Sequence, residues 1–358
     1  MNFTISRRQL RAGLDAVKTA FALKKDQGSI LGTSIKVQAA GDSVTFLTSN
    51  GETFFKWKAP EGVQIERDGS CVANAEKLLS GSNFMGADNV QLEYANDILY
   101  VKGGKVSLEV KTVDESKMPE PPLVEMPLRF NFDSTEFFKK VLSTMGRDVG
   151  TPRMLGMLFD FKSDGDKKVV TIKASQRNRV SRVVESFEGD DNYNIRIIVP
   201  CFLADEASKR RLLAMGSNKS TLSVQFDHLV VTTSAPEDIF VGGDEIFDIA
   251  DGTELRFSHT ELSEAMNFFK SVSDKQNRRT KFDIKGGTAL LSTVSDTGKS
   301  KMEINCECSG EMTLALNSEH LSDLLPTVDK DSIALVATGR MISYKEDNYH
   351  FITSLYAN

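Results

Sequence analysis

Three stretches of the chain repeat one pattern of hydrophobic and polar positions: a short strand led by an aromatic residue, a polar cap and an amphipathic helix. The stretches begin near residues 1, 128 and 255, and Phe3, Phe130 and Phe257 stand 127 positions apart. This spacing exceeds the few tens of residues of a solenoid repeat. The pattern therefore predicts three small domains that are built alike.

The three predicted first helices share a start signal, the capping box. Ser6, Asp133 and Ser258 are each followed three positions later by Gln or Glu. In a capping box the two side chains each satisfy a free backbone amide. Apolar residues then recur at helical spacing, starting with Leu10 and Leu14 in the first helix, so we expect each helix to bury one face.

Alternating segments after each first helix predict β-hairpins, at residues 34–46, 157–172 and 281–292. Further helices are predicted at 75–79, 202–213 and 319–325, and closing hairpins at 90–113, 221–233 and 333–355. Prolines at 119, 121 and 122 mark the first joint, because proline lacks the amide donor that sheets and helices use. Gly242 and Gly243 mark the second joint. The predicted domains are 1–120, 126–247 and 253–358.

The composition is typical of a soluble protein. A length of 358 residues suits two or three domains. With 40% hydrophobic and 26% charged residues, the chain has no apolar run near the roughly 20 residues of a membrane-spanning helix. Arg7 and Arg8 are not followed by the apolar stretch of a signal peptide. We therefore expect a cytoplasmic protein.

Sequence motifs of catalysis and metal binding are absent. The four histidines, His228, His259, His320 and His350, have no metal-ligand spacing, and the chain has no H-E-x-x-H, Gly-rich phosphate loop or G-x-S-x-G elbow. The cysteines lie far apart except for Cys306 and Cys308, which favours buried, reduced thiols over metal ligands. We expect a non-catalytic protein without metal or cofactor.

Five short segments, in order along the repeat, resemble the bacterial DNA polymerase III beta subunit, the sliding clamp of the replicase. They are residues 1–5, 29–32, 155–159, 175–180 and 198–200. The resemblance implies an α+β fold of three clamp-type domains, each with two helices packed on antiparallel sheets. Two chains would close head to tail into a ring around duplex DNA. Such a protein is a processivity factor, tethered to the DNA polymerase and the clamp loader through short linear peptides.

The alternative is a repeat-built protein-interaction module that does not encircle DNA. The charge of the helical segments that the resemblance implies bears on this choice. Segments 7–25, 74–88, 136–153, 205–219, 260–281 and 317–330 hold 21 Lys and Arg against 13 Asp and Glu, whereas the whole chain has a net charge of −6. Basic helices on an acidic protein attract phosphates to one surface.

The basic residues of these segments are the candidate DNA contacts. A single basic helix face is usually just solvated, but the repetition in all three domains favours a DNA-facing surface. Phosphate contacts are independent of sequence, which suits a protein that slides. The predicted DNA-facing residues are Arg7, Arg11, Lys18, Lys24, Lys25, Lys140, Arg147, Arg153, Lys209, Arg210, Lys275 and Arg278.

The resemblance also implies a dimer interface. On the first domain it would be the edge strand that contains Lys105, Val106 and Leu108, and on the third domain the helix end at Ser271 and Val272. A head-to-tail ring needs two different complementary surfaces per chain, and pairing across subunits would cover an exposed strand edge. The alternative for Val106 and Leu108 is a role in the core of the first domain.

A partner-peptide pocket between the second and third domains is the last feature that the resemblance implies. It would be lined by Met154, Ser175, Arg177, Asn178, Arg179, Val180, Val241, Ile246, Ile352, Ser354, Leu355 and Tyr356. The family has glycine where this chain has Arg177, usually histidine at Asn178, and usually a proline and an arginine near the chain end. A basic pair is also replaced by Cys201 and Phe202. We therefore expect a pocket at the same place with changed partner preference.

Overall fold

The computed structural model describes residues 1–22, 31–145, 156–176, 178–188, 193–218, 220–235, 243–249, 252–274, 278–296 and 298–357. It divides into two compact units. Unit 1 is Met1–Asp133 with Arg210–Ala235, and unit 2 is Ser134–Lys209 with Pro236–Asn358. The middle repeat contributes one half to each unit, so the three domain boundaries stay a prediction.

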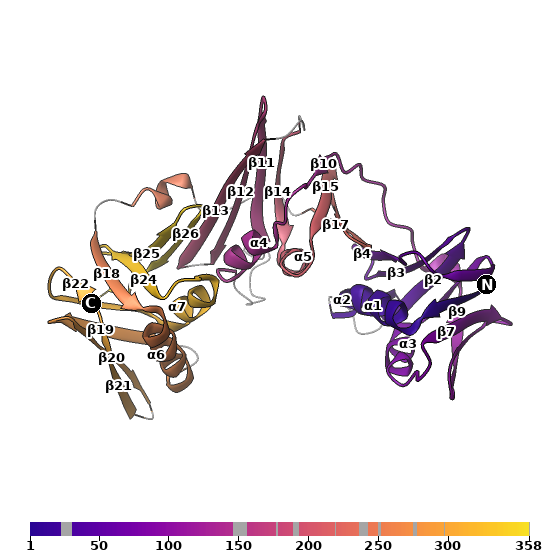
Figure 1. Cartoon of the computed structure of the whole chain (residues 1–358), viewed down its shortest axis with the longest axis horizontal. Helices are drawn as coiled ribbons and strands as arrows, with labels where there is room; N and C mark the ends of the chain where they lie inside the picture. The colour runs from indigo at the N-terminus through magenta and orange to yellow at the C-terminus, as the bar shows by residue number, and fades with distance from the viewer. Residues whose placement is uncertain are drawn as a thin grey trace. The chain divides into compact units, whose positions relative to one another are not determined.

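Unit 1 is built on one antiparallel sheet (Figure 1). Its described strands follow the order β10-β15-β16-β17-β4-β3-β2-β6-β9-β8-β7-β1-β5. They are β1 (Asn2–Ser6), β2 (Ser34–Ala40), β3 (Ser43–Ser49), β4 (Thr53–Lys58), β5 (Gln64–Arg67), β6 (Gly69–Asn74), β7 (Asn89–Ala95), β8 (Ile98–Gly103), β9 (Val106–Val113), β10 (Leu128–Arg129), β15 (Leu212–Asn218), β16 (Thr221–Phe226) and β17 (Leu229–Ser234). The helices are α1 (Arg7–Val17), α2 (Thr19–Ala22) and α3 (Ala75–Ser82), with short turns η1 (Leu31–Thr33) and η2 (Glu115–Lys117).

Unit 2 has two described sheets, ordered β14-β11-β12-β13-β26-β25-β24-β18-β22 and β21-β20-β19-β23. The strands are β11 (Gly156–Asp164), β12 (Lys167–Gln176), β13 (Arg179–Glu188), β14 (Ile195–Pro200), β18 (Thr253–Ser258), β19 (Arg279–Lys285), β20 (Thr288–Ser295), β21 (Gly298–Asn305), β22 (Glu307–Cys308), β23 (Met312–Asn317), β24 (Ser332–Ala337), β25 (Met341–Glu346) and β26 (Tyr349–Ser354). The helices are α4 (Thr135–Leu142), α5 (Cys201–Ala207), α6 (His259–Val272) and α7 (Ser318–Leu324), with turns η4 (Asp244–Phe247) and η5 (Leu325–Thr327).

The repeat found in the sequence is visible in the structure. Phe3, Phe130 and Phe257 are all buried, and the predicted hairpins are confirmed by the pairing of β2 with β3, β11 with β12 and β19 with β20. The helices pack in pairs, α1 beside α3, α4 beside α5 and α6 beside α7. Two helices per repeat therefore lie against antiparallel sheet, as the resemblance implies.

The predicted cap residues of the first helix are confirmed in the first and third repeats, whereas in the second repeat the cap residue is Ser134 rather than Asp133. The hydroxyl oxygens of Ser6 and Ser258 accept from the backbone N–H groups three residues on, at 3.2 and 3.4 Å. The second helix begins at Thr135, and its cap residue Ser134 makes no side-chain capping bond. The reciprocal half of the capping box does not form in α6, because the Glu261 carboxylate accepts from Asn305 instead.

One predicted helix is much shorter than expected. The helix predicted over 202–213 ends at Ala207, and Leu212 already pairs with Phe226 in the sheet of unit 1. Leucine is found in both helices and strands, so residues 212 and 213 do not fix the local structure by themselves. Pairing with a neighbouring strand determines that this segment is a strand. Of the segment 205–219, which entered the charge comparison as a helix, only residues 205–207 are helical, and residues 212–218 form a strand.

Close packing of α1 on the sheet depends on Gly13. A Cβ atom at this position would lie 2.6 Å from two ring carbons of Trp57 and 2.8 Å from Phe46. The rings of Phe46 and Trp57 stack with centroids 5.2 Å apart, and both are buried. Gly13 thus lets the helix approach the two aromatic rings directly.

The four cysteines form no disulfide among the described residues, and two of them are buried. Burial raises the pKa of Cys71 to about 12 and the pKa of Cys306 to about 11. Cys306 lies in the break between β21 and β22 rather than inside a strand. No helix among the described residues has the length and apolar character needed to cross a membrane.

Candidate DNA and partner interfaces

The described DNA-facing candidates of the first repeat, Arg7, Arg11 and Lys18, lie on α1 or directly after it. Arg11 is exposed, and its guanidinium donates to the Asn83 side chain just after α3 at 2.8 Å. Lys18 pairs with Asp15 at 2.8 Å, with 57% of each side chain exposed. Arg7 donates to the carbonyl of Met85 at 3.0 Å. These contacts link the paired helices and leave two cationic groups in water.

The middle repeat places its described cations less uniformly. Lys209 is exposed and pairs with Asp205 one turn earlier on the chain. Lys140 is half-buried, with its ammonium 5.6 Å from the centre of the Tyr349 ring. Arg210 is half-buried as well. The residues next to these two in the sequence, Lys139 and Arg211, are exposed.

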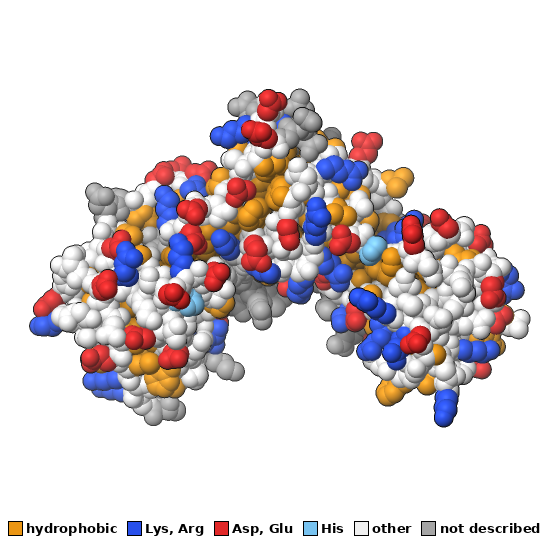
Figure 2. Space-filling model, viewed as in Figure 1, with side chains coloured by type: hydrophobic (Ala, Val, Ile, Leu, Met, Phe, Trp, Pro, Cys, Tyr) orange, Lys and Arg blue, Asp and Glu red, His pale blue; other side chains and the backbone are white. Residues whose placement is uncertain are grey.

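Arg278, the predicted contact of the third repeat, is directed inward. Its guanidinium lies 2.7 Å from the Glu319 carboxylate, with only 16% of the side chain exposed. Five other predicted residues, Lys24, Lys25, Arg147, Arg153 and Lys275, lie outside the described residues. Figure 2 shows basic and acidic side chains interspersed over the visible face. Charge is thus less sharply sorted than the helix counts predict.

Strand pairing brings together part of the predicted partner pocket. Val180 and Ile352 are opposite each other on β13 and β26, and both pack against Phe247 in a buried cluster. Ile249 and Met341 flank this cluster. Ile246, the predicted pocket residue, is 38% exposed. The packed position next to it belongs to Phe247, which the sequence analysis did not single out.

Arg179 is buried in unit 2, where it connects a strand to a helix through an ion pair. Its side chain is 5% exposed and its guanidinium lies 2.8 Å from the Asp323 carboxylate on α7. The Nε–H donates to Gln176 at 2.8 Å, and Lys270 on α6 reaches the other Asp323 oxygen at 3.1 Å. This network ties β13 to both helices of the third repeat.

The turn before β13 is fixed by the backbone of Asn178. Its carbonyl accepts from the Ser354 N–H at 2.8 Å and from the hydroxyls of Thr353 and Ser354 at 3.2 Å. Ser175 lies half-buried at the end of β12. Met154, Arg177 and Val241 lie outside the described residues.

The last two predicted pocket residues line a different hollow. Leu355 and Tyr356 border a cavity of about 510 Å³ together with residues 312–314 and 337–339. The Tyr356 N–H donates to the Ala315 carbonyl at 2.8 Å, and the Arg279 guanidinium lies 5.5 Å from the centre of its ring. The predicted pocket set is therefore divided between the Val180 cluster and this hollow.

An acidic and aromatic turn covers the outer face of β12 and β13, and sequence analysis missed it. Asp244 accepts from Lys173 at 2.6 Å and from Arg182 at 3.2 Å. The hydrogen bond from Lys173 holds the pKa of Asp244 below its usual value. Three residues on, Phe247 lies under the Arg182 guanidinium, 4.3 Å from the ring centre. The run of acidic and aromatic residues at 244–248 was the available signal.

The sequence matches no protein-family model and no curated protein. The structure, however, is similar over its full length to solved clamps. It is 16% identical to the DNA polymerase III beta subunit of Thermotoga maritima, covering 100% of this chain and 99% of that one with a TM-score of 0.86. The sliding clamp of Bacillus subtilis gives 17% identity, the same coverage and a TM-score of 0.86. The beta subunit of Streptococcus pyogenes gives 17%, 100% of both chains and 0.86.

The chain has the sliding-clamp fold. Several strands of this fold have an edge with no strand partner among the described residues, and β9 and β21 are two of them. On β9, residues 106–111 pair only with β8, because β6 reaches only Thr112 and Val113. On unit 2, β21 pairs only with β20. The second edge was missed in the sequence, although residues 298–305 alternate as an edge strand would.

The predicted interface residues of this clamp fold are partly exposed. Lys105 is exposed at the turn before β9, and Val106 is half-buried. Leu108 is half-buried against α3, since a Cβ on Gly81 would meet it at 2.7 Å. Ser271 is exposed and Val272 half-buried at the end of α6. Leu108 therefore has both a packing role and an exposed side.

Metal binding has no support in the part of the chain that is described. No three His, Cys, Asp or Glu side chains within the described ranges come together as metal ligands. His320 and His350 are buried in the sliding-clamp fold of unit 2. His259 bonds through Nε2 to the Leu325 carbonyl at 2.9 Å. Two of these histidines are thus buried in the fold, and the third is hydrogen-bonded to the backbone.

Proposed function

We propose that this chain is a DNA sliding clamp, a non-catalytic cytoplasmic processivity factor that encircles duplex DNA and tethers a DNA polymerase. The observation that carries the proposal is the whole-chain similarity to several sliding clamps, with TM-scores of 0.86 at 16 to 17% identity. The similarity covers all three repeats of the chain. A match to one or two repeats alone would not support a clamp of three repeats per chain.

The arrangement of helices supports contact with DNA. Each repeat packs two helices side by side, and Arg11, Lys18 and Lys209 carry exposed cationic groups on or next to them. Their existing contacts are surface contacts, each worth at most about 1 kcal/mol. Exchanging such partners for phosphates costs little, so the cations can move from one phosphate to the next along the duplex.

Two of the free strand edges support a head-to-tail dimer. The exposed edge of β9 is in unit 1 and the exposed edge of β21 is in unit 2. Two different edges per chain are what a heterologous closed ring requires, and pairing them would cover backbone groups that otherwise promote aggregation. The α6 end at Ser271 and Val272 would lie on the second of these surfaces.

The peptide site is proposed for the junction of the second and third repeats. Val180, Ile352 and Phe247 give it an apolar base, and Leu355 and Tyr356 line the separate hollow described above. Polymerase and clamp loader are the proposed partners. Because Arg179 is held by Asp323, the apolar groups rather than this cation would meet the peptide.

Topological retention on DNA is the expected behaviour of a clamp. Dimers assembled from dilute protein in the presence of nicked circular DNA should remain on the circle through a wash in high salt, which screens the phosphate contacts. Cutting the circle should shorten the residence time by at least about tenfold, because retention then depends only on screened contacts. The measurement is the protein that co-elutes with DNA in gel filtration.

The matched control is the same cut DNA with a bound protein blocking each end. It should retain the clamp as the intact circle does. Equal loss of protein from intact circles, blocked linear DNA and open linear DNA would contradict encirclement.

A further inference from the structure

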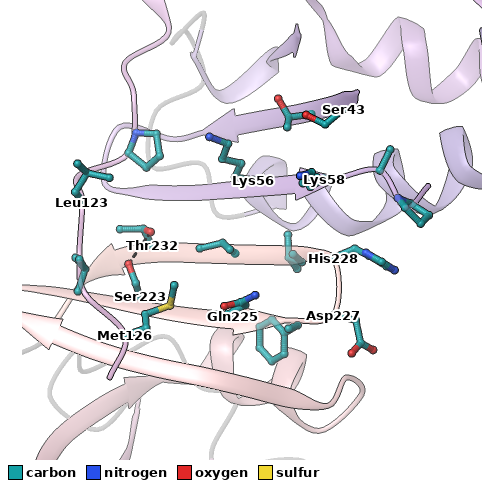
Figure 3. Close-up of a pocket in the computed structure, with 18 of the residues that line it drawn as sticks. Ser43, Lys56, Lys58, Leu123, Met126, Ser223, Gln225, Asp227, His228 and Thr232 are labelled. Atoms are coloured by element: carbon teal, nitrogen blue, oxygen red, sulfur yellow. Dashed lines mark hydrogen bonds between the residues drawn. The ribbon is translucent and has the colours of Figure 1, made fainter. Parts of the chain in front are cut away.

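A groove of about 980 Å³ lies in unit 1, outside the sites described so far (Figure 3). One wall is the linker between the first and second repeats, including Pro122, Leu123 and Met126. The floor is the sheet face of β4, β17 and β16, with Lys56 and Val230 side by side on paired strands. Leu123 is 98% exposed, so the wall presents a large apolar side chain to the solvent.

The groove floor carries cations that have no acidic partner. No carboxylate in the described part of the chain pairs with Lys56 or Lys58. Glu115 and Glu120 both bind Lys36, at 2.9 and 2.7 Å, and Glu125 of the linker is exposed and forms no ion pair with either lysine. Asp227 and Glu61 line the groove without pairing with either lysine. The floor therefore has unneutralised positive charge beside apolar groups.

The strand pair β4 and β17 of the groove has a counterpart in unit 2, the pair β13 and β26. The two pairs have the same register. Leu229 is opposite Trp57, as Tyr349 is opposite Val183. The next backbone bond also repeats, from the Lys58 N–H to the His228 carbonyl at 2.8 Å and from the Val184 N–H to the Asn348 carbonyl at 2.9 Å. By this register Lys56 occupies the position of Arg182, and Val230 that of His350.

In unit 2 this position is filled by the chain itself. Arg182 binds the Asp244 carboxylate at 3.2 Å and stacks on Phe247 at 4.3 Å. Phe247 is 4% exposed and lies 5.4 Å from the His350 ring, centre to centre. A carboxylate and, three residues later, an aromatic ring thus cover the cation and the neighbouring strand. In unit 1 the linker leaves the same place open.

We propose that the groove of unit 1 binds a short peptide of a partner protein in which an acidic residue precedes an aromatic or large apolar residue by three positions. The carboxylate would pair with Lys56, with Lys58 adding positive charge. The ring would lie between Val230 and the wall formed by Pro122 and Leu123. This site is separate from the pocket proposed for the polymerase, and it does not depend on the encirclement of DNA.

A labelled peptide with the sequence of residues 243–249, Gly-Asp-Glu-Ile-Phe-Asp-Ile, provides the probe. Fluorescence anisotropy with the full-length protein should give saturable binding. Lys56→Glu should weaken it by roughly tenfold or more, because it places like charges together. Leu123→Ser, at a side chain too exposed to affect folding, should weaken it as well. Replacing the peptide's Asp244 by Asn or its Phe247 by Ala should have similar effects.

Lys18→Glu is the matched control, since it makes the same charge change on an exposed residue of unit 1 outside the groove. It should leave binding unchanged. Trp57 fluorescence reports whether each variant is folded. Lack of saturable binding, or equal weakening by Lys18→Glu and Lys56→Glu, would overturn the proposal. So would self-association of the protein that Lys56→Glu abolishes, because the occupant would then be a second copy. Lys56→Glu should still be retained on circular DNA, so this test and the test of the clamp can fail independently.

Discussion

Asp323→Asn should lower the free energy of unfolding of unit 2 by about 3–5 kcal/mol, the usual cost of removing one partner of a buried ion pair. The substitution keeps the shape of the side chain but leaves the Arg179 guanidinium, on a side chain 5% exposed, without its carboxylate. Gln176 and the oxygen of the new amide would remain as hydrogen-bond acceptors, but neither carries a negative charge. Total stabilities are about 5–15 kcal/mol, so the loss is a large share.

Urea unfolding followed by far-ultraviolet circular dichroism would measure this effect, with Trp57 fluorescence as an internal reference. Trp57 is the one tryptophan of the chain and lies in unit 1. Asp283→Asn is the control, because it breaks the Lys281 pair whose side chains are 51% and 37% exposed and should cost at most about 1 kcal/mol. Adding Arg179→Met to Asp323→Asn should restore part of the loss. Equal effects of Asp323→Asn and Asp283→Asn would show that the ion pair between Arg179 and Asp323 stabilises unit 2 no more than a surface pair does.

Acidification from pH 7.5 to 5.0 should destabilise unit 2 by about 4 kcal/mol through His320 and His350, or about 2 kcal/mol from each. Burial, with a further contribution from Arg179, lowers the pKa of His320 to about 3. Burial, together with Lys345 and Arg182, lowers the pKa of His350 to about 4. Both pKa values are depressed on folding. The unfolded chain therefore binds more protons below pH 6.5, and stability falls as the pH falls from 6.5 toward these values.

The hydrogen bonds of His320 indicate which nitrogen carries its proton. The Thr353 hydroxyl donates to the Asn178 carbonyl at 3.2 Å, so it accepts from Nδ1–H of His320 at 2.6 Å. A second proton would have to reach Nε2 in a site that already contains Arg179. A variant with His320→Asn and His350→Asn should lose about 4 kcal/mol less than the wild type between pH 7.5 and 5.0. His228→Asn, at an exposed histidine of unit 1, should lose as much as the wild type.

Local signals in the sequence predicted the fold well. The spacing of Phe3, Phe130 and Phe257, the serine caps and the alternating hairpins are properties of neighbouring residues, and they survive in the structure. The errors occurred where distant strands decide. Leu212 leaves its predicted helix because Phe226 offers a strand partner, and this pairing joins segments of the chain that hairpin patterns do not identify.

The candidate site was harder to predict for the same reason. Val180 and Ile352, two residues predicted for the pocket, lie opposite each other on paired strands. Arg179 was expected to line the pocket, but its guanidinium binds Asp323, a residue 144 positions away. The covering role of Phe247 depends on the linker folding back over β13. Such contacts follow from the register of the sheets rather than from any local pattern.

An electron micrograph of single purified particles tests the closed ring most directly. The expected particle is a ring of two chains, with a mass twice the 39.5 kDa of one chain, a twofold axis and a central opening wide enough for duplex DNA. Extended single-chain particles, or dimers without a central opening, at the concentrations that load DNA would contradict the closed ring.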